Sequence, residues 1–287
     1  MRTIRTLPSV ILSVAVVALA ACTSAPRTEA AGVERLYVID CGENRTMDLS
    51  PWTTAADKGK PYSFANHCYL IKHAKGWMLW DSGHPDAYAA TPEGVPNLRR
   101  TSLAIMHKPL VQSLREIGVA PADIGYFGMS HSHADHTGNA NLFAGATIFM
   151  QTAEYDAAFG PQPQRYAYNP ATYSELRNAR IVKLDGEHDV FGDGSVVIES
   201  TPGHTPGHQS LFVRLHKSAP VLIGGDMVHL QQNWDARRAP SINFDKELTI
   251  QSMDRMRGFM QQTGARLWIN HDAEQARTMI MAPAFID

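Results

Sequence analysis

Residues 131–136 read His-Ser-His-Ala-Asp-His, within the longer stretch GMSHSHADHTGN (128–139). The stretch places three imidazoles and a carboxylate between an apolar run and a small-residue turn. Residues two apart in an extended segment project to the same side, so His131 and His133 can bind one metal ion. Asp135 and His136 follow the bend toward a helix expected to begin near Thr137, so they face a different point. One ion does not easily take all four side chains, whereas two adjacent ions can.

Residues of the same chemical type recur in turn-rich settings at the ends of expected strands: His204 in TPGHTPGH, Asp226 in IGGD and His271 in INHD. In open α/β architectures ligands gather at strand ends. Five histidines and two aspartates suit a pair of borderline divalent ions. A histidine-rich surface loop is the plain alternative, but it does not explain why ligand-type residues recur at these distant positions.

The order of expected elements indicates an α/β layered fold. The apolar and alternating runs predict strands at 35–41, 68–72, 76–81, 123–129, 146–151, 180–184, 196–200, 210–215, 221–223 and 267–270. Helical spacing predicts helices at 107–117, 137–143, 172–178 and 246–263, with Gly118 ending the first of them. The strand at 123–129 would deliver Ser130 and His131 at its C-terminal end.

With these partners, HSHADH resembles the His-x-His-x-Asp-His motif of the metallo-β-lactamase superfamily. The resemblance implies a four-layer αβ/βα sandwich with a two-metal site between its β-sheets. His204, Asp226 and His271 fall in the family's order, and Asp81 in WDSG matches the turn that lies beneath the family's site. The likeness extends from about residue 34 to the end of the chain.

The resemblance also implies a role for each ligand. One ion would be held by His131, His133 and His204, the other by Asp135, His136 and His271, and Asp226 would bridge them. Zinc is the expected metal for both positions, with iron, cobalt and manganese as alternatives. Asp81 would accept the second ring N–H of a ligand imidazole and so fix its tautomer.

Within the superfamily, the runs TPGHTPGHQSLFV and GGDMVHLQQNWDARRAPSINFDKELTIQSMDRM are most similar to N-acyl-homoserine lactone lactonases. The implied activity is opening of the lactone ring by attack of a metal-bound hydroxide. Asp135 would shuttle a proton or serve only as a ligand. His229 stands where those lactonases often have a tyrosine, so it is either a catalytic hydrogen-bond donor or a rim residue. Met47, Trp52 and Phe64 would line the groove for the acyl tail.

Other functions remain open at this point. The same site can hydrolyse another ester, a thioester or a phosphodiester. Antibiotic-degrading β-lactamases fit less well, because they typically have cysteine or serine where Asp226 stands. Iron-containing relatives that reduce oxygen or NO need a flavin domain, which this sequence does not show. A non-catalytic binding module would have a broken ligand set, whereas all seven positions are filled.

The N-terminus predicts export. Arg2 and Arg5 precede a short apolar run, which is typical of a secretory signal. The run ends in Leu19-Ala20-Ala21-Cys22, which resembles the lipobox of bacterial lipoproteins. The expected parts are therefore a lipoprotein signal peptide at 1–21, a lipidated N-terminus and tether at 22–33, and the hydrolase domain at 34–287. An ordinary signal peptide with a chance cysteine is the alternative.

These parts predict the partners and the location. The protein is expected on the periplasmic side, with the lipid anchor as its contact with the membrane. Thr23, which is not aspartate, favours the outer membrane. Loss of residues 1–21, which contain two arginines and no acidic residue, would leave 24 basic and 28 acidic residues and a net charge of −4. This balance argues against a nucleic-acid partner, and a small lactone substrate and a family-based homodimer are expected instead.

The other histidines and the cysteines carry weaker predictions. His208 is expected to support the turn around His204, and the role of His67 is left open. The remaining histidines are assigned to surfaces or loops: His73, His84, His107, His188 and His216. A disulfide between Cys41 and Cys68 is allowed in the periplasm, but a buried free thiol is common in a run such as CYLI, so the pairing stays open.

Overall fold

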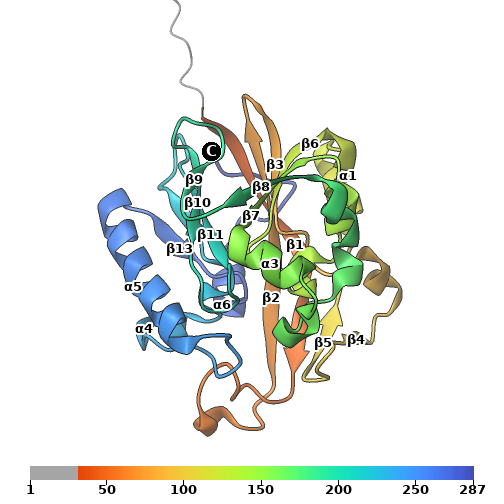
Figure 1. The fold of residues 1–287 in the computed structure, drawn as a ribbon, viewed down its shortest axis with the longest axis vertical. Coiled ribbons are helices and arrows are strands. Elements are labelled where there is room, and N and C mark those ends of the chain that lie inside the picture. Colours follow the sequence, from red (N-terminus) through yellow and green to blue (C-terminus); the bar gives the residue numbers. More distant parts are fainter. Residues whose placement is uncertain (1–31) are drawn as a thin grey trace, which may run out of the picture. The chain divides into compact units, whose positions relative to one another are not determined.

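The computed structural model describes residues 32–287 and arranges their strands in two sheets (Figure 1). The larger sheet has the order β4-β5-β1-β2-β3-β6-β7-β8. Its strands are β1 Val33–Thr46, β2 Tyr62–His73, β3 Gly76–Trp80, β4 Val95–Pro96, β5 Ser102–Ile105, β6 Ile124–Gly128, β7 Thr147–Gln151 and β8 Arg180–Leu184. Neighbours from β3 to β8 run parallel, whereas β1, β2 and β5 pair antiparallel.

The smaller sheet has the order β13-β12-β11-β10-β9. Its strands are β9 His188–Asp189, β10 Val196–Ser200, β11 Gln209–Val213, β12 Val221–Ile223 and β13 Arg266–Trp268. Only β12 and β13 pair in parallel, and the helix that connects them packs on the outer face of this sheet.

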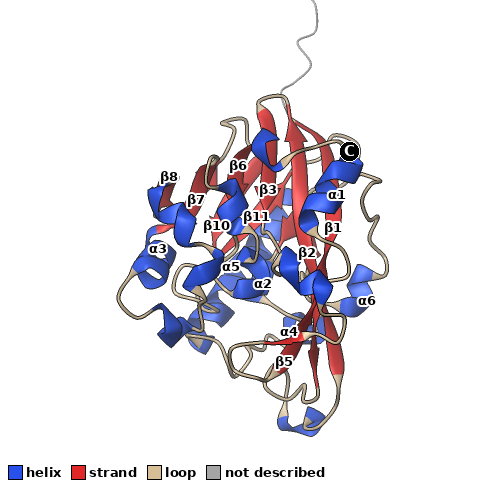
Figure 2. Ribbon diagram, turned by 90° about the vertical axis from the view of Figure 1, so that its right-hand side faces the viewer, coloured by secondary structure: helices blue, strands red, loops and turns tan. Residues whose placement is uncertain are grey.

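The described residues form six α-helices, and those that pack against the sheets lie on their outer faces (Figures 1 and 2). They are α1 Leu110–Ile117, α2 Ala134–Thr137, α3 Thr152–Phe159, α4 Gln231–Asp235, α5 Lys246–Thr263 and α6 Ala273–Ala276. Helix α1, which faces the viewer in Figure 2, and α3 lie against the larger sheet, and α5 lies against the smaller one.

Three apolar clusters fill the spaces between these layers. Leu114 of α1 and Ala158 of α3 pack with Phe127 of the larger sheet. Trp80 and Ile198 belong to a second cluster, in which side chains of the two sheets meet. Met253 and Met256 of α5 pack on the smaller sheet in a third cluster. Helix, sheet, sheet and helix form four layers, which confirms the predicted αβ/βα sandwich.

Most predicted elements are confirmed, and α5 has the predicted bounds. Gly118 ends α1 in the left-handed region, with φ of 84°. The helices predicted at 137–143 and 172–178 are wrong: these segments contain the short 3₁₀ turns Ala140–Phe143 and Ser174–Asn178. In the first segment the helical backbone is interrupted at Asn139, whose φ and ψ are −117° and 14°. The helix α3 was not predicted.

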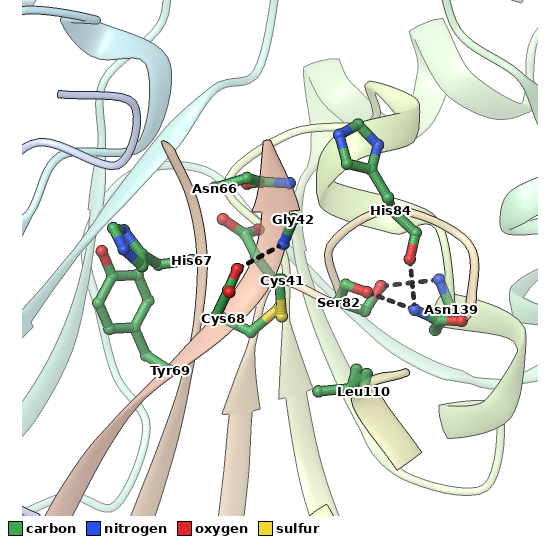
Figure 3. Close-up of a disulfide and its surroundings, with 12 residues drawn as sticks. Cys41, Gly42, Asn66, His67, Cys68, Tyr69, Ser82, His84, Leu110 and Asn139 are labelled. Carbon is green, nitrogen blue, oxygen red and sulfur yellow. Dashed lines mark hydrogen bonds between the residues drawn. A yellow bond between two sulfur atoms is a disulfide. The ribbon is translucent and has the colours of Figure 1, made fainter. Parts of the chain in front are cut away.

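Cys41 of β1 and Cys68 of β2 form a disulfide, which settles the pairing left open above (Figure 3). The disulfide lies beside the turn that follows β3. The carbonyl of Cys41 accepts a hydrogen bond from the backbone N–H of His84, and a side chain at Gly83 would collide with Cys41. Both cysteines are fully buried.

The predicted signal peptide and nearly all of the predicted tether lie outside the described residues. The exceptions are Gly32, which precedes the sheet, and Val33, which begins β1. Within residues 32–287, no helix has the length and apolar character that a membrane span requires.

Candidate metal centre

Loops at the ends of strands from both sheets bring the predicted ligands together. The segment after β6 carries residues 131–136, the β10–β11 loop carries His204, and the ends of β12 and β13 carry Asp226 and His271. They form two groups, and the ligand atoms within each group lie within 4.8 Å of one another. The first ligand group is His131, His133, His204 and Asp226; the second ligand group is Asp135, His136 and His271.

Asp226 lies between the two groups and presents one oxygen to each. Its Oδ2 atom is 3.2 Å from Nε2 of His204 and 3.9 Å from Nε2 of His131. Its Oδ1 atom is 3.2 Å from Nε2 of His136 and 3.0 Å from Nε2 of His271. The carboxylate therefore has the placement that a ligand shared by two ions requires.

In the first group, hydrogen bonds on the far sides of the rings determine which nitrogens face inward. Nε2 of His133 donates to the carbonyl of Tyr166 at 2.9 Å, and Nδ1 of His204 donates to Oδ1 of Asn243 at 3.0 Å. The opposite nitrogens are then lone-pair acceptors. Nδ1 of His133 lies 3.1 Å from Nε2 of His204 and 2.8 Å from Nε2 of His131.

In the second group, a carboxylate and a backbone carbonyl likewise accept hydrogen bonds from the outer ring nitrogens of the two histidines. Nδ1 of His136 donates to Oδ2 of Asp81 at 2.9 Å, and Nδ1 of His271 donates to the carbonyl of Ala65 at 2.6 Å. Asp81 also accepts the backbone N–H of Ser130 at 2.6 Å. It adopts a φ of 58°, which is unusual for a residue other than glycine. The strained backbone at Asp81 is thus held by hydrogen bonds to the segment that carries the ligands.

The donor set fits two divalent cations. The inner ring nitrogens of the first group turn lone pairs toward one another, so they receive no hydrogen bond there. In addition, Nε2 of His136 and Oδ1 of Asp226 are buried without a hydrogen-bond partner. Burial keeps the pKa values of His131 and His204 well below the usual one, so these rings are neutral. Uncompensated buried charge is costly, and a cation between the groups would satisfy both the lone pairs and the carboxylates.

Each ligand group contains one carboxylate, Asp226 in the first and Asp135 in the second. Burial disfavours ionisation of Asp135, but the imidazoles of His136 and His271 hold its pKa below the usual value. The surrounding carboxylates, Asp226 foremost, raise the pKa of His136 well above its usual value against the opposing effect of burial. Without metal, a proton on His136 would balance the charge of these carboxylates, and a bound cation would replace that proton.

A pocket of about 560 Å³ opens onto both groups. Trp52 and Phe64 line it, with ring centroids 4.9 Å apart, as the sequence predicted. Met47, the first residue after β1, does not: it is 76% exposed and lies outside the pocket lining. Leu98 and Phe244 add apolar surface that the sequence did not suggest.

His229 lines this pocket beside the ligands. Its Nε2 atom is 3.0 Å from Oδ2 of Asp226, and its ring stacks against that of His271 with centroids 5.5 Å apart. Its Nδ1 atom has no hydrogen-bond partner among the described residues. The residue is 3% exposed, so it belongs to the buried floor of the pocket rather than to its rim.

Two histidines assigned to surfaces or loops are buried. His73 contacts Asp193 at 2.9 Å and stacks on Phe191, so β2 continues into the core where a loop was expected. His84 lines the pocket, and burial lowers its pKa to about 4. By contrast, His107 and His216 are exposed and His188 is half-buried.

His208 supports more than the turn around His204. Its Nε2 atom accepts the backbone N–H of Asp226 at 2.9 Å, and burial lowers its pKa to about 3, so the ring is a neutral acceptor. His67 is buried, and burial lowers its pKa to about 4. It lies outside both ligand groups.

Several supporting residues were not identified from the sequence: Asn44, Asn66, Glu154 and Asn243. Asn44 donates to Oδ2 of Asp135 at 2.8 Å, and Asn66 donates to the carbonyl of Asp135 at 2.7 Å. No motif marks these residues, because their partners lie far away in the chain.

Comparison with known proteins agrees with this geometry. The metallo-beta-lactamase superfamily profile matches residues 62–259. The N-acyl homoserine lactonase AttM of Azorhizobium caulinodans is 30% identical over 267 residues, which cover 88% of this chain and 98% of that protein. The N-acyl homoserine lactonase AiiA of Bacillus thuringiensis subsp. kurstaki is 30% identical over 259 residues, covering 88% and 99% respectively.

Solved structures agree as well. A structure of N-acyl homoserine lactone hydrolase with the product N-hexanoyl-L-homoserine bound at its catalytic metal centre has a TM-score of 0.79 and 29% identity. The match covers 89% of this chain and 100% of that one. The dizinc lactonase AidC, at 18% identity and a TM-score of 0.63, shares the fold. This chain belongs to the metallo-β-lactamase superfamily and is a metal-dependent hydrolase of that fold.

Proposed function

We propose that this hydrolase opens the lactone ring of N-acyl-homoserine lactones. The observation that carries the proposal is the pair of ligand groups joined through Asp226 in a pocket that also presents apolar side chains. Relatives named N-acyl homoserine lactonase support the substrate class. A lactone with an acyl tail needs both features, because its ester must reach the metals while its tail avoids water.

Zinc is the metal we propose for both groups, because zinc binds imidazole nitrogen and carboxylate oxygen. Zinc held by the two groups would supply Lewis-acid chemistry: it would lower the pKa of a bound water to about 7 and would polarise the lactone carbonyl. Hydrolysis then breaks the bond between the carbonyl carbon and the ring oxygen. The ring oxygen needs a proton as it leaves.

Asp135 and His229 are the residues we propose for the remaining steps. Asn44 holds the carboxylate of Asp135 toward the pocket, where it can carry a proton to the ring oxygen. His229 is placed beside Asp226 to donate a hydrogen bond to the carbonyl oxygen as negative charge develops there. Trp52 and Phe64 are proposed to contact the acyl tail.

Turnover of a substrate panel by metal-loaded protein tests the proposal. The panel contains acyl-homoserine lactones of several chain lengths, an aryl ester, a thioester and a phosphodiester. The phosphodiester is included because Arg99 and Arg165 also line the pocket. We expect ring-opened N-acyl-homoserine as product and the highest kcat/KM on a lactone. Protein that holds two metals per chain yet prefers another substrate would overturn the assignment.

We also propose that the chain is lipidated at Cys22 and held on the periplasmic side, in the outer membrane. The lipobox-like Leu19-Ala20-Ala21-Cys22 supports this proposal. The disulfide between Cys41 and Cys68 is compatible with it, because disulfides persist in oxidising compartments such as the periplasm.

A further inference from the structure

Glu154 is a buried carboxylate that no step of the proposed reaction uses. It lies in the first turn of α3 and is 1% exposed. A carboxylate at this depth is costly unless it accepts several hydrogen bonds. Glu154 accepts four, and each donor belongs to a segment outside α3.

Two of these donors lie on the loop that carries His204. The hydroxyl of Thr205 donates to Oε2 at 2.8 Å, and the backbone N–H of Gly207 donates to the same oxygen at 3.1 Å. Gly207 approaches so closely that a Cβ there would lie 2.2 Å from the backbone nitrogen of Glu154. The second glycine of TPGHTPGH is therefore explained by its packing against this residue.

The other two donors lie beside His133. The backbone N–H of Ser132, between two ligand histidines, donates to Oε1 at 2.7 Å. The hydroxyl of Tyr168 donates to the same oxygen at 2.7 Å. Burial and the neighbouring carboxylate raise the pKa of Tyr168 well above its usual value, so the phenol stays protonated. The ring of Tyr168 packs edge-on against His133, with centroids 5.5 Å apart.

All four contacts thus support one ligand group. Ser132 lies between His131 and His133, and Thr205 follows His204, so the segments held by Glu154 carry the three imidazoles of the first group. The second group is supported elsewhere: Asn44 holds Asp135, Asp81 holds His136, and the carbonyl of Ala65 holds His271.

We propose that Glu154 is a positioning residue that sets the geometry, and hence the metal affinity, of the first ligand group alone. The inference rests on the proposed occupancy of both groups by metal. Elemental analysis of the wild-type protein, which should give two metals per chain, tests that occupancy separately. Lactone turnover plays no part in the test, so a different substrate would leave the inference intact.

The test measures zinc affinity one group at a time, by competition with a chromophoric chelator. In a His271→Ala background the retained tight site is the first group, and Glu154→Gln should weaken it about 10- to 100-fold, the range for lost support of a metal ligand. In a His204→Ala background the retained site is the second group, and Glu154→Gln should change its affinity less than about 3-fold. The amide keeps the shape of the side chain but replaces one acceptor oxygen with a donor.

Matched variants separate positioning from general destabilisation. Glu199→Gln alters another buried glutamate, which belongs to neither ligand group and makes no hydrogen bond to a ligand, and should leave both affinities unchanged. Asn44→Ala should show the reverse pattern, weakening the second group and sparing the first. If Glu154→Gln does not fold, Tyr168→Phe removes one donor and should weaken the first group in the same direction by a smaller factor. Equal weakening of both groups, or no weakening of the first, would overturn the inference.

Discussion

The Nε2 atom of His229 lies 3.0 Å from Oδ2 of Asp226, the carboxylate placed between the two ligand groups. If Asp226 bridges two metals, a carbonyl bound to them would therefore lie next to the imidazole of His229. His229→Ala is expected to lower kcat about 10- to 1000-fold, the range for losing one hydrogen-bond donor or general acid. His229→Tyr should recover much of the loss, because a phenol can donate to the same region.

The measurement is kcat on one acyl-homoserine lactone for wild type and both variants at matched metal loading. Metal content should be the same in all three proteins. If His229→Ala turns over like wild type, His229 has no part in the reaction, and the proton must come from Asp135 or from water.

Replacing Asp226 tests the shared ligand. Asp226→Ala removes the one side chain that presents an oxygen to each group. We expect the variant to lose about one metal per chain and nearly all activity, because a two-metal site depends on the ligand that joins its ions. Elemental analysis and turnover check this together. Two metals per chain with full turnover would contradict the bridging role.

Asp81 offers a test of ligand orientation. Asp81→Asn replaces a carboxylate that accepts from His136 and Ser130 by an amide with a single acceptor oxygen. We expect a loss of metal affinity of about 10- to 100-fold. Asp193→Asn is the control, because Asp193 pairs with buried His73 but lies outside both ligand groups. An equal effect of the two substitutions would show that Asp81 acts only on stability.

The disulfide makes a prediction about stability. Cys41 and Cys68 are 27 residues apart in sequence. Closing a loop of this length stabilises the folded state by about 3.5 kcal/mol in the chain-entropy model. The Cys41→Ser/Cys68→Ser double variant should therefore have a lower free energy of unfolding, measured by denaturant titration. Reductant should lower the midpoint of the wild type and leave that of the variant unchanged; an unaffected wild type would show that the thiols are not paired.

Lipidation is tested at Cys22. Intact-mass measurement of the wild-type protein should show a mature chain that begins at Cys22 and carries acyl groups. Cys22→Ser should leave the chain unprocessed or move it from the membrane fraction to the soluble one. A mature chain that begins at another residue, or that lacks acyl mass, would refute the lipid anchor and favour an ordinary signal peptide.

The sequence predicts the ligand segment well because the relevant forces are local. His131 and His133 share a face by strand geometry alone, and the Gly-rich and Pro-rich turns around His204 and Asp226 mark strand ends. The helix α5 was predicted to the residue because its apolar spacing is long and its C-terminal glycine is clear. Short segments that contain a glycine, such as residues 137–143, show too little apolar periodicity to predict a helix and its bounds reliably.

What could not be predicted depends on contacts between segments distant in the chain. His84 looks like a loop residue, yet the disulfide-linked strand beside it buries the ring in the pocket wall. Asn44 lies 91 positions from Asp135, so no spacing rule connects them. Met47 looks like a groove residue by its apolar character, but it lies just past the end of β1 and is largely exposed.

Each ligand group draws side chains from both sheets: His131 and His136 follow β6 of the larger sheet, whereas His204 and His271 follow strands of the smaller one. A bound ion would therefore link the larger sheet and its helices to the smaller sheet and its helices. Metal binding and folding then become one linked equilibrium, in which an ion at 100 times its Kd adds about 2.7 kcal/mol to the free energy of unfolding. The resistance of the chain to heat and proteolysis would thus depend on how much of the metal its surroundings supply.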